Sequence, residues 1–234
     1  MKRILVNTDW KSENKMIEIR FTLIGDGRSD RALIPIVKWL LDDLFPEIPS
    51  SIAFADFRYV KAPPSKQNVK GQIEFAKEYY PYDILLYHRD GETTNIDIVK
   101  VRKGEILSQV NDEDKSNTVC IIPVKMMETW LLINAEALKR AAGNRNYTEN
   151  LSIPNVNQLE NIKAPKQLLQ ELLKQASGLK GRRLKKFNVH QSVHLLADNI
   201  IDYSPLRKLN SFLFFESELK QVLKKINQYP NKSA

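Results

Sequence analysis

The chain has 234 residues, enough to bury an apolar core without disulfides, and its 42% apolar and 27% charged residues are ordinary for a globular protein. A single cysteine, Cys120, excludes an intrachain disulfide framework and favours a reducing compartment such as the cytoplasm. No apolar run approaches the ~20 residues of a membrane-spanning helix, so we expect no contact with a membrane.

The net charge of +8 is unevenly distributed along the chain. Residues 1–150 contain 22 Lys or Arg and 22 Asp or Glu, whereas residues 151–234 contain 14 basic and 6 acidic residues. The whole excess of positive charge therefore lies in the last third of the sequence. Such asymmetry favours contact with a polyanion, most often nucleic acid, although a basic solvated surface has the same composition.

The first predicted strand begins just after Met16. Residues 1–15 contain too short an apolar stretch for a secretory signal, so we expect a loose leader or an artefact of the choice of start codon. Residues 17–24, IEIRFTLI, alternate and then become continuously apolar, which predicts a central strand. Residues 29–45 carry an apolar stripe at helical spacing, which predicts a helix with Ser29 as its N-cap.

Strands and helices continue to alternate along the next part of the chain. Further strands are predicted at 51–60, 82–88 and 117–124, and further helices at 68–80, 96–110 and 125–142. This order predicts an α/β fold with a mostly parallel, four-stranded sheet flanked by helices. Right-handed crossovers bring the carboxyl ends of the strands to one edge, which is where open sheets of this kind bind ligands.

The composition changes after residue 145. Residues 143–165 are rich in asparagine and contain two prolines, which is typical of a connector. Three helices are predicted beyond it, at 166–177, 188–201 and about 205–226. We therefore divide the chain into a leader (1–15), an α/β domain (16–145) and a basic helical C-terminal region (146–234) packed on that domain.

Four acidic residues follow the predicted strands. Asp26 follows the first strand, Asp90 and Glu92 follow the third, and Glu128 lies in the first turn after the fourth. In a parallel sheet these carboxylates converge, and they repel one another unless a cation lies among them. Oxygen ligands favour Mg²⁺ or Mn²⁺, which supports phosphate chemistry. Each acid alone is better explained by turn chemistry or by a helix dipole, and only the set of acids at three strand ends favours a metal site.

The motifs GDGRSDRALIPI, HRDGE, PVKMMETWLL and SGLKGRRLKKF…DYSPLRKLNSF occur in this order. They resemble the TOPRIM domain, the metal-binding fold of type IA and II topoisomerases, primases and OLD-type nucleases. DGRSD (26–30) resembles its Glu-Gly-x-x-Asp motif, and DGE (90–92) resembles its Asp-x-Asp motif. Over roughly residues 17–215 the chain is similar to an uncharacterised bacterial TOPRIM-like family whose relatives include proteins of phage-defence loci.

The resemblance implies roles for the four acids. Asp26 is the expected general acid/base or a metal ligand, and Asp90 and Glu92 are the expected main ligands. Glu128 completes the cluster or holds a second metal. Asp26 is one methylene shorter than the usual glutamate, and Glu92 is one methylene longer than the usual aspartate. A site that has lost catalysis and only binds therefore remains open.

Basic residues form a second candidate site. The segment KGRRLKKF (180–187) has five positive charges in eight residues, and we expect it to hold a nucleic-acid backbone, although a solvated helix end has the same pattern. The candidate nucleic-acid contacts are Arg89, Lys180, Arg182, Arg183, Lys185 and Lys186. Arg89 alternatively pairs with an acid. His88 is a candidate proton shuttle or phosphate contact, and otherwise packs beside the sheet edge.

His190 and His194 have the spacing of a zinc-binding helix face, but the glutamate of H-E-x-x-H and a third ligand are absent. Asp198 continues their row, so we expect a solvated polar face.

Three functions remain open from the sequence. The first is a Mg²⁺-dependent nuclease that hydrolyses DNA or RNA, as an anti-phage effector controlled by a regulatory partner protein or by homo-oligomerisation. The second is a catalytically inactive nucleic-acid-binding or assembly subunit. The third is an enzyme that acts on a small phosphorylated ligand.

Overall fold

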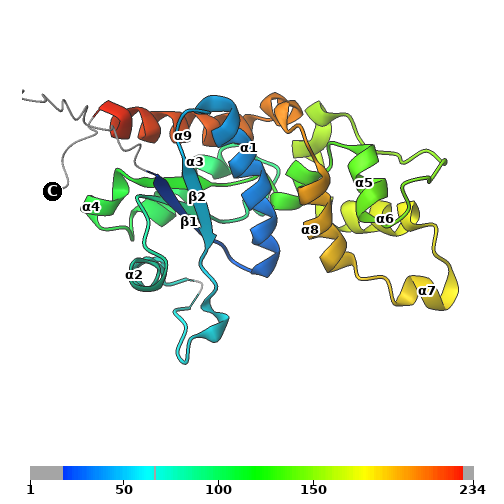
Figure 1. Cartoon of the computed structure of the whole chain (residues 1–234), viewed down its shortest axis with the longest axis horizontal. Helices are drawn as coiled ribbons and strands as arrows, with labels where there is room; N and C mark the ends of the chain where they lie inside the picture. The colour runs from blue at the N-terminus through cyan, green and yellow to red at the C-terminus, as the bar shows by residue number, and fades with distance from the viewer. Residues whose placement is uncertain (1–17, 66, 229–234) are drawn as a thin grey trace, which may run out of the picture.

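A computed structural model describes residues 18–65 and 67–228. These residues form a mixed α/β structure with an all-parallel, four-stranded sheet flanked by helices (Figure 1). The predicted leader, 1–15, lies outside the described residues. Within the described ranges, no helix is both long and apolar enough to cross a bilayer.

The sheet has the strand order β2-β1-β3-β4. Its strands are β1 (Ile19–Ile24), β2 (Ser50–Phe54), β3 (Ile84–His88) and β4 (Thr118–Ile121). All three pairings are parallel, so every strand ends at the same edge. The prediction of a parallel four-stranded sheet is therefore confirmed.

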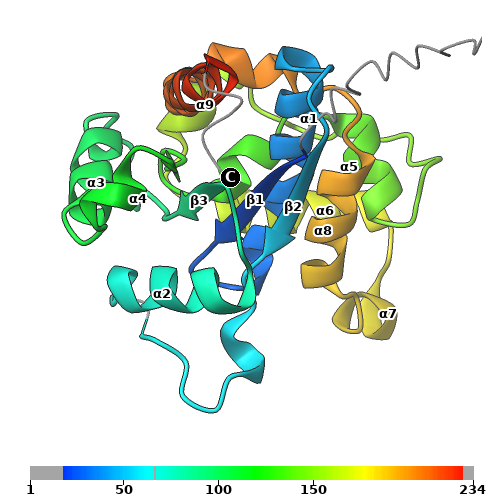
Figure 2. The same cartoon turned by 60° about the vertical axis from the view of Figure 1, so that its left-hand side comes forward.

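Apolar side chains cover both faces of the sheet because successive residues of a strand point in opposite directions. In β3, Ile84 and Leu86 face one apolar cluster, whereas Leu85 and Tyr87 face the other. The first cluster is completed by α1 (Ile34–Leu44), α5 (Ala135–Ala141), α6 (Pro165–Ser177), α8 (Val189–Asn199) and α9 (Asn210–Gln228). The second is completed by α2 (Val69–Tyr79) and α3 (Ile98–Leu107), on the other side of the sheet (Figure 2).

Several predicted elements end earlier than their apolar patterns suggest. The strand predicted at 51–60 ends at Phe54, and a 3-10 turn, η2 (Phe57–Tyr59), follows it. The Asp56 side chain accepts a hydrogen bond from the Arg58 N–H and starts this turn, which turns the chain away from the strand. The helix predicted at 96–110 corresponds to α3, which ends at Leu107. A separate short helix, α4 (Asp112–Lys115), follows it.

Two predicted helices begin as 3-10 helices. The helix expected at 29–45 consists of η1 (Arg28–Leu33) and then α1, and its N-cap is Gly27 rather than Ser29. Pro35 lies in the first turn of α1, where its missing N–H does no harm. The helix expected at 125–142 is divided into η3 (Met127–Leu131) and α5. Asn134 restarts the helix because its side chain caps the Ala137 N–H at 2.9 Å.

The C-terminal region contains more breaks than predicted. Its further elements are η4 (Val156–Asn161), α7 (Gly181–Lys185) and η5 (Ser204–Lys208). Gly178 ends α6 in the left-handed conformation, with φ 64°, which glycine adopts without strain. Pro205 begins η5, and the extended backbone of Leu209 separates η5 from α9, so the helix predicted at about 205–226 starts at Asn210.

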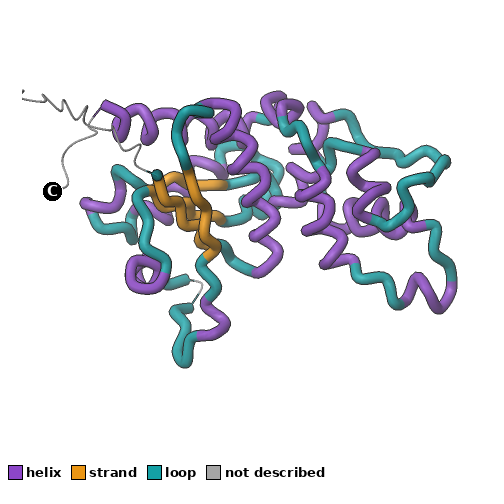
Figure 3. The backbone as a smooth tube through the Cα atoms, in the orientation of Figure 1, coloured by secondary structure: helices purple, strands orange, loops and turns teal. Residues whose placement is uncertain are grey.

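Helices of the C-terminal region share the core of the sheet. The Trp130 ring, which is 0% exposed, lies 5.2 Å from the Phe212 ring and 6.0 Å from the Phe215 ring of α9. Its indole N–H donates to the Ser211 hydroxyl at 3.2 Å. Figure 3 shows the strands confined to one half of the molecule, with helices and loops forming the other half. The strand ends and the C-terminal helices are thus fixed relative to one another by a common apolar core.

Candidate functional site

Asp30 and His88 meet beneath the carboxyl edge of the sheet. Asp30 is 5% exposed, and its Oδ2 accepts a hydrogen bond from the Gly27 N–H at 3.0 Å. Its Oδ1 accepts a second bond from the Ser29 hydroxyl at 3.2 Å. These bonds hold the carboxylate 3.8 Å from His88 Nε2. Sequence patterns identify Asp30 only as part of the DGRSD motif, because neither its burial nor its histidine partner follows from spacing.

His88 is a buried cation at the end of β3. Its Nδ1–H donates to the Ile121 carbonyl at 2.9 Å, and its Nε2 lies 3.4 Å from Asp90 Oδ1. Burial alone lowers the pKa of His88, but the nearby carboxylates of Asp30 and Asp90 together raise the pKa to about 9. At neutral pH the ring is therefore a protonated link between two carboxylates. With 1% exposure, it is better placed to hold its proton than to exchange it with solvent.

The raised pKa of His88 predicts a pH-dependent stability of the metal-free protein. The folded state binds the proton more tightly than the unfolded chain, whose pKa is near 6.5. The stabilisation is therefore complete below about pH 6.5 and lost as the pH rises through about 9, by roughly 3 kcal/mol. Urea unfolding in EDTA at intervals across this range measures the loss. His88→Gln should remove this component, and an unchanged pH profile in that variant would contradict the assignment.

A hydrogen bond from the Met127 backbone to the Asp90 side chain brings Asp90 close to Glu128. Asp90 Oδ1 accepts from the Met127 N–H at 2.9 Å, which joins the loop after β3 to the start of η3. The next residue, Glu128, is 5% exposed, and its Oε1 lies 3.4 Å from Lys166 Nζ. Burial raises the pKa of Glu128, the charge of Asp90 raises it further, and Lys166 opposes the shift. The two carboxylates are therefore electrostatically coupled, as their positions after β3 and β4 predict.

Glu92 is engaged elsewhere. Its backbone is left-handed, with φ 62°, and its N–H donates to the Lys125 carbonyl at 2.6 Å. Its side chain is 73% exposed, and Oε2 lies 2.6 Å from a guanidinium nitrogen of Arg102 on α3. Arg102 also binds Glu105 at 2.9 Å, and Arg89 lies 3.8 Å from the same Glu105. The guanidinium of Arg102 thus already balances the charge of Glu92, and Arg89 contacts an acid.

Asp26 lies at the end of β1 and is half-buried. Together with Arg28 and Phe57 it lines a cavity of about 370 Å³ beside the end of β2. Burial raises the pKa of Tyr87 to about 12, and the charge of Asp26 contributes to that shift. Asp26 therefore lies within electrostatic range of β3, on the edge that also carries Asp90.

The acids suit a divalent cation in chemistry but are not assembled into a compact ligand set. Within residues 18–65 and 67–228, no three His, Cys, Asp or Glu side chains form a group that could hold a metal ion as they stand. The structure joins Asp30, His88 and Asp90, and it couples Asp90 to Glu128. Burial and then the charge of Asp90 raise the pKa of Glu128, and a cation bound by oxygen ligands would oppose both effects.

The backbone beside Asp26 provides a matched pair of variants. A Cβ on Gly25 would lie 2.7 Å from both Cβ and Oδ2 of Asp30, which is buried and held by two hydrogen bonds. We expect Gly25→Ala to lower the free energy of unfolding by about 1–3 kcal/mol. A Cβ on Gly27 would meet no atom closer than the Ser29 hydroxyl at 3.9 Å, so Gly27→Ala serves as the control. Equal stability of the two variants in urea unfolding would contradict the tight packing around Asp30.

The basic segment 180–187 lies apart from these acids. Lys180 caps α7, which carries Arg182, Arg183 and Lys185, and Lys186 follows it. All five basic side chains are exposed. In Figures 1 and 2, α7 lies at the periphery of the helical region, away from the strands. Its contact with nucleic acid stays a prediction, and the structure does not bring it to the sheet edge.

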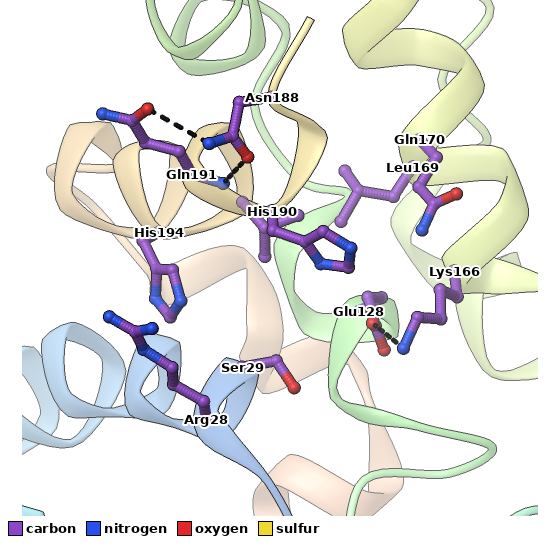
Figure 4. A pocket seen from close by; sticks show the side chains of 11 residues that line it. Arg28, Ser29, Glu128, Lys166, Leu169, Gln170, Asn188, His190, Gln191 and His194 are labelled. Atoms are coloured by element: carbon purple, nitrogen blue, oxygen red, sulfur yellow. Dashed lines mark hydrogen bonds and ion pairs between the residues drawn. The ribbon is translucent and has the colours of Figure 1, made fainter.

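A cavity of about 740 Å³ opens beside Glu128 (Figure 4). Its walls come from η1, η3, α6 and α8, and both His190 and His194 line it. The predicted polar face is exposed at His190 and Asp198, and its two histidines also border this cavity. Spacing alone identified their shared helix face, but only the packing of α8 opposite η1 and α6 shows that this face borders a cavity.

Comparisons with protein-family models, with curated proteins and with solved structures found no match for this chain. The resemblance to TOPRIM proteins stays a prediction, and the functional argument rests on the residues described above.

Proposed function

We propose that the protein is a Mg²⁺- or Mn²⁺-dependent nuclease with a TOPRIM-like fold, which hydrolyses phosphodiester bonds in DNA or RNA. The observation that carries the proposal is the coupling of Asp90 with Glu128 at the carboxyl edge of a parallel sheet. Ligands bind at this edge in open α/β sheets. Neighbouring carboxylates are the ligands by which proteins hold divalent cations for phosphoryl reactions.

Asp26, Asp90 and Glu128 would hold the cation. When bound, the metal supplies a positive charge for the phosphate oxygens and lowers the pKa of water. The Met127 N–H orients the Asp90 carboxylate, and His88 Nε2 lies 3.4 Å from Asp90 Oδ1 and 3.8 Å from Asp30 Oδ2. Burial raises the pKa of Glu128, which favours a role for this side chain in proton transfer. His88 acts in this proposal as a fixed charge, in place of the proton shuttle expected from the sequence.

A second function, nucleic-acid binding without cleavage, is favoured by the pairing of Glu92 with Arg102 at 2.6 Å. The TOPRIM resemblance assigns Glu92 to the metal, whereas this ion pair occupies its carboxylate. If Glu92 is needed as a ligand, the site binds its cation weakly. The protein would then hold a strand by its basic residues alone, with affinity that falls steeply with salt.

The two functions are separated by incubating the full chain with plasmid, single-stranded DNA and tRNA in Mg²⁺, Mn²⁺ or EDTA. Cleavage that requires a metal supports the nuclease. Metal-independent, salt-sensitive binding of the same substrates without cleavage supports the binding subunit and rejects the nuclease. Metal-dependent thermal stabilisation without affinity for polyanions rejects both, and leaves the small phosphorylated ligand that the sequence also allowed.

The cellular setting of the proposal follows from the resemblance and from Cys120. A nuclease that is always active would damage its host, so we expect control by a partner protein or by homo-oligomerisation, as an anti-phage effector requires. Cys120 is buried in β4 and free, which suits a reducing cytoplasm. Size-exclusion chromatography with light scattering, with and without nucleic acid, tests the oligomerisation.

A further inference from the structure

The cavity beside Glu128 is surrounded by basic side chains from three elements. Arg28 comes from η1, Lys166 from the first turn of α6, and His190 and His194 from α8. Figure 4 shows the two histidines projecting from α8 toward the opposite wall, where Arg28, Glu128 and Lys166 lie. Of the lining residues that the structure describes, Glu128 alone is acidic.

Three of these four basic side chains have no partner among the described residues. Lys166 lies 3.4 Å from Glu128, but the side chains of Arg28, His190 and His194 have no ion pair or hydrogen bond among the described residues. Burial lowers the pKa of His194, and the charges of Arg28, Arg31 and His190 lower it further against the opposing charge of Asp198. His194 is therefore a neutral ring beside the positive charge of Arg28, and a bound anion would balance that charge and favour protonation of the ring.

The position and size of the cavity indicate which kind of anion it can bind. The Ser29 hydroxyl on its wall donates to Asp30, and Glu128 on the same wall is coupled to Asp90. An anion in the cavity therefore lies next to the acids of the proposed metal site. The fork of an arginine binds two phosphate oxygens at once. A volume of about 740 Å³ exceeds that of a lone phosphate and suits a nucleotide unit.

We propose that the cavity between η1, η3, α6 and α8 binds the phosphate group of a nucleotide, with Arg28, His190 and His194 as its contacts. The phosphate belongs either to a nucleic-acid strand or to a free nucleotide. Its assignment to a strand rests on the proposed function, whereas the anion site itself does not. The site gives the strand a contact next to the acids, which the exposed segment 180–187 does not supply.

Isothermal titration in EDTA tests the site without any cleavage. Inorganic phosphate and 5′-AMP are titrated into the full chain and into Arg28→Gln, His194→Gln and Arg145→Gln. We expect Arg28→Gln and His194→Gln each to weaken binding of both probes about tenfold or more, because each removes a charged or polar contact. Arg145→Gln, an exposed position after α5 that does not line the cavity, should bind both probes like wild type. Circular dichroism of each variant verifies that a loss reflects the site and not unfolding.

Failure to bind either probe at millimolar concentration, or equal effects of all three variants, would overturn the inference. The source of the phosphate follows from displacing 5′-AMP with a short single-stranded oligonucleotide, with and without a 5′-phosphate. If either oligonucleotide displaces 5′-AMP, the site binds the phosphate of a strand. If neither does, it binds the phosphate of a free nucleotide. Phosphate binding by a protein that cleaves nothing would reject the nuclease and keep this site. If Arg28→Gln leaves cleavage unchanged and the protein binds no phosphate, the nuclease is kept and this phosphate site is rejected.

Discussion

Asp90→Asn is expected to lower the rate of metal-dependent cleavage ~1000-fold or more, because it removes the charge of a central metal ligand. Asparagine has the same shape, and its carbonyl oxygen can still accept the Met127 N–H that aligns η3. The fold and the basic surfaces are therefore retained. Initial rates on a labelled substrate in Mg²⁺, with binding measured by fluorescence anisotropy in EDTA, separate chemistry from affinity.

Asp97→Asn provides the matched control for this substitution. Asp97 is exposed at the start of α3, in the same loop, and its side chain makes no capping hydrogen bond. The control should cleave at the wild-type rate. Cleavage by Asp90→Asn at a rate near that of Asp97→Asn would remove Asp90 from the proposed metal site.

Trp130→Ala is expected to lower the free energy of unfolding by about 3–5 kcal/mol. Trp130 is 0% exposed and packs against Phe212 and Phe215 of α9, so alanine leaves a cavity between η3 and the C-terminal helix. The change also leaves the buried Ser211 hydroxyl without its indole partner. Urea unfolding of wild type and variant gives the difference in free energy.

Trp39→Ala is the comparison for the core substitution. Trp39 is only partly buried, its ring lies 6.1 Å from Tyr203, and Arg207 stacks over it at 5.0 Å. Its loss should cost less than that of Trp130, because part of its surface already faces water. Equal destabilisation by the two substitutions would contradict a core that extends from the sheet into the C-terminal helices.

The sheet was predictable because its signals are local. The run ILLYH of β3 is apolar on both faces, as a central parallel strand requires, and the alternation of strands with helices implies parallel connections. The ends of helices were harder to predict. Asn134 and Leu209 interrupt predicted helices whose apolar stripes continue past them, and periodicity alone does not reveal such interruptions.

The site was predictable only as far as topology determines it. The coupling of Asp90 with Glu128 follows from two neighbouring strands that end at one edge. The pairing of Glu92 with Arg102 does not, because it depends on a left-handed backbone and on the direction of a side chain on α3. Arg28 and Lys166 were likewise missed as cavity residues, since only packing brings η1 and α6 together.

Anomalous diffraction from a crystal soaked in Mn²⁺ tests the central claim most directly. Our account predicts a manganese peak at the carboxyl edge of the sheet, with carboxylate oxygens of Asp26, Asp90 and Glu128 among its ligands. A well-ordered edge without a peak, or a peak bound by other residues while Asp90 and Glu128 keep their present contacts, would contradict it.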